Sequence, residues 1–300
     1  MAQPRVDHEV RLTEGVVYGH ALVDVNSAPR ERALQLNRYE PVDAPAAGER
    51  RPALVMAFGG AFHRGNRSAD EFGEGARTNT PVSAYCRMFA RRGWVACSID
   101  YRLVQEDPDP GSTPVIGSPA RVPMSRVSRV RELLGLPPTT AERVCATIEA
   151  ATDDMTSAVR FVRAHAQAWG IDPKAIVIGG FSAGARIALG AAYGERVGVA
   201  GVVSISGYLA DDDLQRCVRG TPDEPPALLI HGEHDLDYIV EQTPAMTRRF
   251  AAAGRGSQTW RVDGAGHFYP STSAAERTDG QRATVADAIT AFLQDTVGRR

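Results

Sequence analysis

The chain has 300 residues, of which 43% are hydrophobic and 23% charged, a composition ordinary for a soluble globular protein of one large domain or two small ones. Its formal net charge is −2 at pH 7, and basic and acidic residues are mixed along the chain, so we expect no nucleic-acid partner. No stretch reaches the ~18 apolar residues of a membrane span, and the first 20 residues lack the apolar core of a signal peptide, so we expect a cytoplasmic protein with no membrane partner.

Short apolar runs alternate with helical patterns along most of the chain. In chain order the sequence predicts an antiparallel edge hairpin from 16–25 and 33–41, a strand over 53–60, a helix over 81–93, a strand over 94–101, a helix or helix pair over 140–170, a strand, sharp turn and helix over 175–194, strands over 197–207 and 226–232, a helix over 239–254, a strand over 257–264 and a helix over 280–297. Apolar strands separated by helices indicate a mostly parallel sheet with helices on both faces. We therefore predict a single α/β domain over residues 1–300.

One region, residues 103–139, breaks this alternation. It is rich in proline and serine and contains a short amphipathic piece over 127–136. A long connection inside a compact domain is usually functional or disordered. We interpret the segment as a lid over a pocket; the alternative is a passive surface insertion.

The strongest chemical signal is the run Gly180-Phe181-Ser182-Ala183-Gly184, which matches G-x-S-x-G between an apolar strand and a helix. Such a serine occupies a tight strand-to-helix turn that requires small neighbours. The dipole of the following helix favours negative charge developing beside the hydroxyl. We therefore predict that Ser182 is a nucleophile, the alternative being a plain tight turn.

A serine hydroxyl needs a neighbouring base to act as a nucleophile. His267 lies in a glycine-rich loop after the last predicted strand, and no other histidine comes late enough to follow an acid in the chain order nucleophile, acid, histidine. The acid that orients the imidazole is expected after the strand before that loop, where the chain offers Glu233, Asp235 and Asp237. We favour Asp235.

Acyl transfer also needs backbone N–H groups that stabilise an oxyanion. The run FGGAFHRGN (58–66) follows a predicted strand, and we expect donors from Gly60 and Ala61, joined by Ala183 after the nucleophile. The alternative is an ordinary glycine turn. Because the run matches neither G-x-G-x-x-G nor G-x-x-x-x-G-K-[ST], a nucleotide site is disfavoured.

Six stretches carry a resemblance to a known family: FGGAFHRGN, SIDYRL (98–103), the DD-to-WGIDP stretch (153–173), GGFSAGA, HGEHD and GAGHF. Over residues 16–295 the chain resembles the carboxylesterase branch of the α/β-hydrolases, near the hormone-sensitive-lipase and feruloyl-esterase-like groups. The resemblance implies the α/β-hydrolase fold and Asp235 as the acid. Phe58 replaces the histidine that commonly starts the oxyanion loop in these enzymes, so the anchoring of that loop differs here.

Together these features predict a serine carboxylesterase that cleaves a small to medium, apolar small-molecule ester through an acyl-enzyme. An amide, formamide, lactone or C–C bond hydrolase using the same triad is the alternative, and a non-catalytic ligand-binding protein is disfavoured because no triad member is missing. Four aromatic residues are candidates for substrate contact, each equally consistent with core packing: Phe62, Phe181, Phe268 and Tyr269.

The sequence gives no sign of a metal or an organic cofactor. Its four cysteines lie far apart with no C-x-x-C, which favours buried free thiols. The proposed serine chemistry needs neither kind of group. The sequence leaves a homo-oligomer open.

Overall fold

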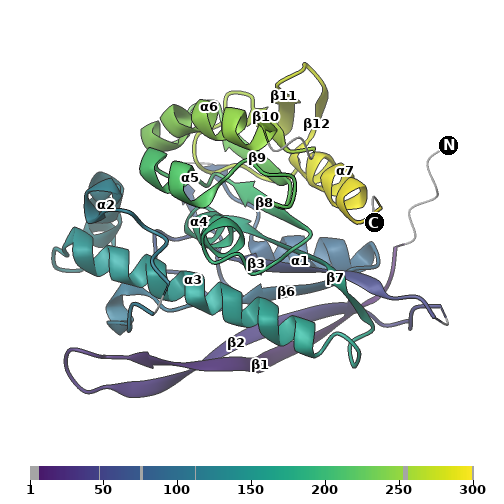
Figure 1. Ribbon diagram of the computed structural model, residues 1–300, viewed down its shortest axis with the longest axis horizontal. Coiled ribbons are helices and arrows are strands. Elements are labelled where there is room, and N and C mark those ends of the chain that lie inside the picture. The colour runs from purple at the N-terminus through teal and green to yellow at the C-terminus, as the bar shows by residue number, and fades with distance from the viewer. Residues whose placement is uncertain (1–6, 47, 75–76, 112, 253–255, 299–300) are drawn as a thin grey trace.

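A ten-stranded sheet forms the centre of the protein (Figure 1). The computed structural model describes residues 7–46, 48–74, 77–111, 113–252 and 256–298. The strands of this sheet are β1 (Val10–Val23), β2 (Arg30–Pro41), β3 (Arg51–Ala57), β6 (Val95–Ile99), β7 (Ile171–Phe181), β8 (Gly201–Ile205), β9 (Ala227–Gly232), β10 (Gln258–Val262), β11 (Ala274–Arg277) and β12 (Arg282–Thr284). A separate small hairpin joins β4 (Gly73–Glu74) and β5 (Arg77–Thr78).

The strand order is β1-β2-β6-β3-β7-β8-β9-β10-β11-β12. The six strands from β6 to β10 pair in parallel, whereas both edges of the sheet are antiparallel. Every residue of β6 and β8 is buried, as expected for strands covered on both faces. The predicted parallel centre and edge hairpin are therefore confirmed.

Helices cover the two faces of this sheet. They are α1 (Val82–Arg91), α2 (Met124–Leu133), α3 (Ala141–Ala164), α4 (Ala183–Leu189), α5 (Asp211–Cys217), α6 (Asp237–Ala252) and α7 (Val285–Gly298), with the short turns η1 (Val104–Glu106), η2 (Pro119–Arg121) and η3 (Gly190–Gly194). Figure 1 shows α3 and α4 in front of the sheet and α1 behind it. The Arg92 side chain, just after α1, donates a hydrogen bond to Thr290 of α7, which joins these two helices.

The chain differs from the sequence prediction at several places, which include the unpredicted short strands β4, β5 and β11. The predicted helix over 280–297 begins only at Val285, because the chain first turns at Asp279 and Gly280 and returns as β12. Residues 211–217 form α5 where no element was predicted. Three consecutive aspartates at the start of this segment suggest a loop, yet the first turn of a helix favours negative charge.

The segment over residues 103–139 is largely ordered against the rest of the domain. It contains η1, η2 and α2, and it enters beside Arg102, which forms a buried ion pair with Asp154 of α3 at 2.9 Å. The Glu149 carboxylate of α3 accepts the N–H groups of Val115 and Ile116, at 2.7 and 2.8 Å. The segment is therefore fastened near its middle, with α2 beyond that point.

The parallel strands all point their carboxyl ends at one edge of the sheet, where ligand and catalytic sites of such folds gather. The segments that follow β3, β7, β8, β9 and β10 all begin at this edge. No helix within the described ranges combines the length and apolar character needed to cross a membrane.

Candidate active site

The candidate nucleophile lies in a strained turn between β7 and α4. Ser182 has φ 54° and ψ −113°, a conformation that L-residues rarely adopt. A Cβ atom on Gly184 would lie 2.0 Å from the Ala57 carbonyl oxygen, and one on Gly180 would lie 2.4 Å from the Gly184 carbonyl carbon. The glycines of the motif are thus required because β3, the turn and α4 approach each other closely.

Three segments that are distant in sequence meet at this turn. His267 Nε2 lies 2.9 Å from Ser182 Oγ, and His267 Nδ1 lies 2.6 Å from Asp235 Oδ1. The side chains of His267 and Asp235 are 3% and 0% exposed, so this hydrogen bond is shielded from water. The structure therefore brings together the three residues that the sequence predicted as a triad.

The Asp235 carboxylate is held by several donors in addition to His267. Its Oδ2 accepts hydrogen bonds from Ser206 Oγ at 2.6 Å and from the Gly232 N–H at 3.1 Å, and its Oδ1 accepts one from the Leu236 N–H at 2.8 Å. Burial alone would raise the pKa of Asp235, but the charge of His267 and these hydrogen bonds outweigh it and lower the pKa below 3.8. The carboxylate therefore stays ionised at neutral pH.

Glu233 and Asp237, the two other acids considered from the sequence, lie outside the triad. Glu233 accepts the Gly264 N–H at 2.8 Å, and Asp237 is the first residue of α6. Neither forms a hydrogen bond or an ion pair with His267 among the described residues. The geometry thus favours Asp235.

Ser206, directly after β8, is a residue of the site that sequence reasoning missed. Its single hydroxyl proton is committed to Asp235, so the Tyr269 hydroxyl at 2.8 Å must donate to Ser206 Oγ. Tyr269 also lies 3.3 Å from the Ile230 carbonyl oxygen. The only signal in the sequence was the position of Ser206 after a buried strand at the same edge.

We expect Ser206→Ala to lower kcat/KM for an ester by roughly 10-fold, because Asp235 loses a charge-assisted hydrogen bond. Because Ser206 acts on the reaction through Asp235, the loss should fall mainly on kcat and leave KM nearly unchanged. Steady-state rates over a range of ester concentrations give both constants. A loss confined to KM would contradict the positioning role.

The backbone donors predicted for an oxyanion come from the segment after β3 and from the start of α4. Ala183 is the first residue of α4, so its N–H has no partner within the helix. The N–H groups of Gly60 and Ala61 donate to no other described residue, and both residues adopt positive φ, 108° and 53°. Ala61, Ala183 and Ser182 line one cavity, so two of the three predicted oxyanion donors lie near the candidate nucleophile.

Tyr101 anchors the loop that begins at Phe58, the position where the carboxylesterases that the sequence resembles commonly have histidine. Its ring stacks on Phe58 with centroids 4.2 Å apart, and its hydroxyl donates to the Phe58 carbonyl oxygen at 2.9 Å. Farther along the loop, the Val104 N–H donates to the Phe62 carbonyl oxygen at 2.9 Å. The segment after β6 thus holds this loop through its backbone, and no histidine is needed at position 58.

A small cavity of about 40 Å³ adjoins the candidate nucleophile, which is room for only a few water-sized groups. Its lining is mainly apolar and aromatic, with two arginines. The lining residues are Ala61, Phe62, Val122, Pro123, Arg126, Val127, Val144, Ile148, Ser182, Ala183, Arg186, Ser206, Tyr208, Tyr238 and Ile239. The four from 122, 123, 126 and 127 come from the 103–139 segment.

The aromatic residues predicted to contact substrate divide into two groups. Phe62 lines the cavity, whereas Phe181, Phe268 and Tyr269 are not among its lining residues. The rings of Phe181 and Phe268 pack against His267, with centroids 5.2 and 5.0 Å from its ring. All three are buried, so Phe181 and Phe268 support the histidine and Tyr269 supports Ser206.

The described residues contain no group of three or more His, Cys, Asp and Glu side chains arranged to hold a metal ion. Cys86, Cys97, Cys145 and Cys217 are free thiols. Burial raises the pKa of the Cys97 thiol to about 12, so this cysteine is a poor nucleophile and a poor metal ligand at neutral pH.

Residues 139–267 match a family described as phospholipase/carboxylesterase, and this range contains Ser182, Asp235 and His267. No curated protein matches the chain by sequence. Among solved structures, the chain is similar to a native thermophilic esterase from the planctomycete Thermogutta terrifontis, with 21% identity, a TM-score of 0.55, and 87% of this chain and 83% of that chain covered.

Two further structures are of Thermogutta terrifontis esterases with bound groups. Esterase 2 phosphorylated by paraoxon matches with 21% identity and a TM-score of 0.58, over 88% of this chain and 85% of that chain. The propionate-bound esterase matches with 21% identity and a TM-score of 0.54, over 87% and 85%. The likeness establishes the α/β-hydrolase fold for this chain, as the sequence predicted.

Proposed function

We propose that this protein is a serine carboxylesterase whose triad is Ser182, His267 and Asp235. The observation that carries the proposal is the continuous hydrogen-bonded row from Asp235 Oδ1 through the imidazole to Ser182 Oγ, with distances of 2.6 and 2.9 Å. A hydroxyl aligned with a base that is itself oriented by a carboxylate has the geometry of an activated nucleophile.

In the proposed reaction Ser182 Oγ attacks the acyl carbon while His267 Nε2 takes the hydroxyl proton. The negative charge that develops on the acyl oxygen is stabilised by the N–H groups of Gly60, Ala61 and Ala183. His267 then gives the proton to the leaving alcohol oxygen. A water molecule attacks the acyl-enzyme, again with His267 as base, and releases the acid and the free serine.

The mainly apolar lining of the cavity favours a small to medium ester with an apolar chain. Its volume of about 40 Å³ is far below the ~300 Å³ or more of sites that enclose drug-sized ligands. Val122, Pro123 and Val127 form one wall of this space. We therefore propose that the 103–139 segment is a lid whose α2 part moves outward to admit substrate and closes over it.

The motifs favour a place near the hormone-sensitive-lipase and feruloyl-esterase-like groups within the α/β-hydrolases. A triad alone does not select the bond, because it serves esters, amides and other acyl compounds. We expect ester cleavage to exceed amide cleavage, which steady-state rates on an ester and an amide with the same acyl group measure directly.

A fluorophosphonate probe tests the proposed nucleophile. We expect the protein to gain the mass of one phosphonyl group, with the label on the peptide that contains Ser182, and Ser182→Ala to gain none. Ser204 lies on the neighbouring strand β8 and supplies the control, since Ser204→Ala should keep the label. Labelling of Ser182→Ala at the wild-type rate would refute the assignment.

A further inference from the structure

Two arginines and no carboxylate line the cavity beside the proposed nucleophile. Arg126 comes from α2 and Arg186 from α4, and none of the described lining residues is an aspartate or a glutamate. Asp235 does not line this cavity. The charge available to a bound substrate therefore depends on whether each arginine already has a partner.

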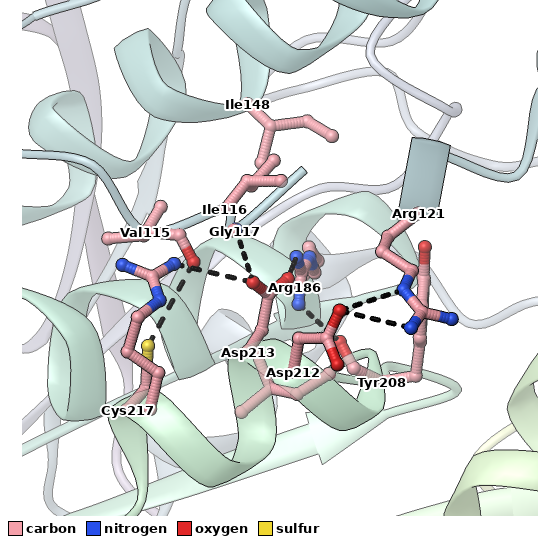
Figure 2. Close-up of polar contacts among 12 residues, drawn as sticks. Val115, Ile116, Gly117, Arg121, Ile148, Arg186, Tyr208, Asp212, Asp213 and Cys217 are labelled. Carbon is pink, nitrogen blue, oxygen red and sulfur yellow. Dashed lines mark hydrogen bonds and ion pairs between the residues drawn. The ribbon is translucent and has the colours of Figure 1, made fainter. Parts of the chain in front are cut away.

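Arg186 is already neutralised by the protein. Its Nη2 lies 2.5 Å from Asp213 Oδ2, and the side chains of Arg186 and Asp213 are 7% and 0% exposed. Figure 2 shows this pair within a larger set of contacts, in which Asp213 also accepts the Gly117 N–H at 2.6 Å. Arg186 Nη1 donates to the Tyr208 carbonyl oxygen at 3.2 Å. Arg186 therefore has a structural partner and carries little net charge toward the cavity.

Arg126 has no such partner. Its guanidinium forms no ion pair and no hydrogen bond with any residue that the structure describes, whereas its backbone N–H donates to the Pro123 carbonyl oxygen at 3.0 Å, and the residue is half-buried. The guanidinium lies over the Phe268 ring, whose centroid is 5.8 Å from the guanidinium carbon. Phe268 follows His267 in the chain, so this positive charge lies close to the triad.

The uncompensated charge affects its surroundings. Burial lowers the pKa of Arg64, and the neighbouring charge of Arg126 lowers it further. A partly desolvated guanidinium without a counter-charge is energetically unfavourable. A bound anion can form the ion pair with Arg126 that no described residue of the protein forms. The planar group offers paired N–H donors that match a carboxylate.

We propose that the preferred substrate is an ester that carries a carboxylate, bound by Arg126. Half-esters of dicarboxylic acids and acyl esters of hydroxy acids have this chemistry. The apolar side chains of Val122, Val127 and Ile239 contact the carbon chain, and Arg126 binds its charged end. Because Arg126 belongs to α2, the same ion pair holds the proposed lid over the bound ester. This inference rests on the proposed esterase function and adds the substrate class.

Two pairs of esters test the proposal. Each pair compares an anionic ester with a neutral one, and the charge lies on the acyl part in the first pair and on the alcohol part in the second. Ethyl hydrogen succinate is compared with ethyl pentanoate, and 3-acetoxypropanoate with butyl acetate, with acid release followed at constant pH. We expect the wild type to prefer the anionic member of at least one pair. In Arg126→Gln the anionic-to-neutral ratio of kcat/KM for that pair should fall about 10- to 100-fold, the usual worth of a charge-assisted pair.

Two further variants complete the test. Arg129→Gln on the same helix is the matched control, because Arg129 is exposed and pairs with Glu132, and it should leave the ratio unchanged. Arg126→Lys keeps the positive charge but lacks the paired N–H donors of the guanidinium, so its anionic-to-neutral ratio should lie between those of Arg126→Gln and the wild type. In the wild type, added salt should lower the ratio, and in Arg126→Gln it should not.

The outcomes separate this inference from the proposed function. A preference for the neutral member in both pairs, or an unchanged ratio in Arg126→Gln, would overturn the role of Arg126 while leaving the esterase intact. If no ester is cleaved, or if Ser182→Ala cleaves them as fast as the wild type, the proposed function itself fails.

Discussion

Replacing Asp235 with asparagine is expected to lower kcat for ester hydrolysis by about 10⁴-fold, because the imidazole then adopts the wrong tautomer. In the native protein Gly232 donates its N–H to one carboxylate oxygen of Asp235, and Leu236 donates its N–H to the other. The side-chain amide nitrogen of the asparagine therefore faces a donor in either orientation of the side chain. When that nitrogen faces the ring, His267 accepts at Nδ1 and carries its proton at Nε2. No base then remains for Ser182.

The neighbouring aspartate supplies the control for this variant. Asp237→Asn should change kcat less than about 2-fold, since Asp237 is exposed and forms no hydrogen bond with His267 among the described residues. Steady-state kinetics of both variants, with circular dichroism to verify folding, decide between the two acids. A loss in Asp237→Asn larger than that in Asp235→Asn would identify Asp237 as the acid.

The same carboxylate links activity to the stability of the fold. Its pKa in the folded protein lies below 3.8, so the unfolded chain binds its proton more readily. Ionised Asp235 therefore stabilises the fold at neutral pH, and this contribution disappears as the pH falls through the lowered pKa. Asp235→Asn removes it at every pH.

Local patterns were sufficient to predict the elements that matter most for the site. The central strands are apolar at nearly every position, as a sheet covered on both faces requires. The motif G-x-S-x-G indicates a tight turn, because Gly180 and Gly184 have no Cβ atoms that would clash there. Spacing and chain order then led to His267 and Asp235. These signals lie within single segments, so one sequence reveals them.

Features that depend on contacts between distant segments could not be predicted in this way. Ser206 bonds to Asp235, 29 positions along the chain, and Tyr101 bonds to Phe58, 43 positions away. No local sequence pattern predicts either contact. The short strand β12 was missed for a related reason. It pairs only with β11, and its three residues contain neither a buried run nor a clear alternation.

Gly60→Ala is expected to lower kcat by about 10²- to 10³-fold, the usual cost of losing an oxyanion donor. Gly60 has φ +108°, and a Cβ atom there would lie 2.1 Å from the Arg64 carbonyl oxygen. The loop must shift to relieve that contact, which moves the N–H groups of Gly60 and Ala61 away from the acyl oxygen. Because ground-state binding depends less on these donors, KM should change far less than kcat.

Gly280→Ala separates the loss of donors from the general cost of a positive φ. Gly280 has φ +89° in the turn between β11 and β12, and a Cβ atom there meets nothing within 4 Å. Both variants strain the backbone by roughly 1–2 kcal/mol. Only Gly60→Ala should lose turnover. It should also bind a trifluoromethyl ketone more weakly, because this inhibitor forms a tetrahedral oxyanion with the serine. Equal losses in the two variants, or full turnover in Gly60→Ala with an unchanged melting temperature, would show that the 58–66 loop does not supply the oxyanion donors.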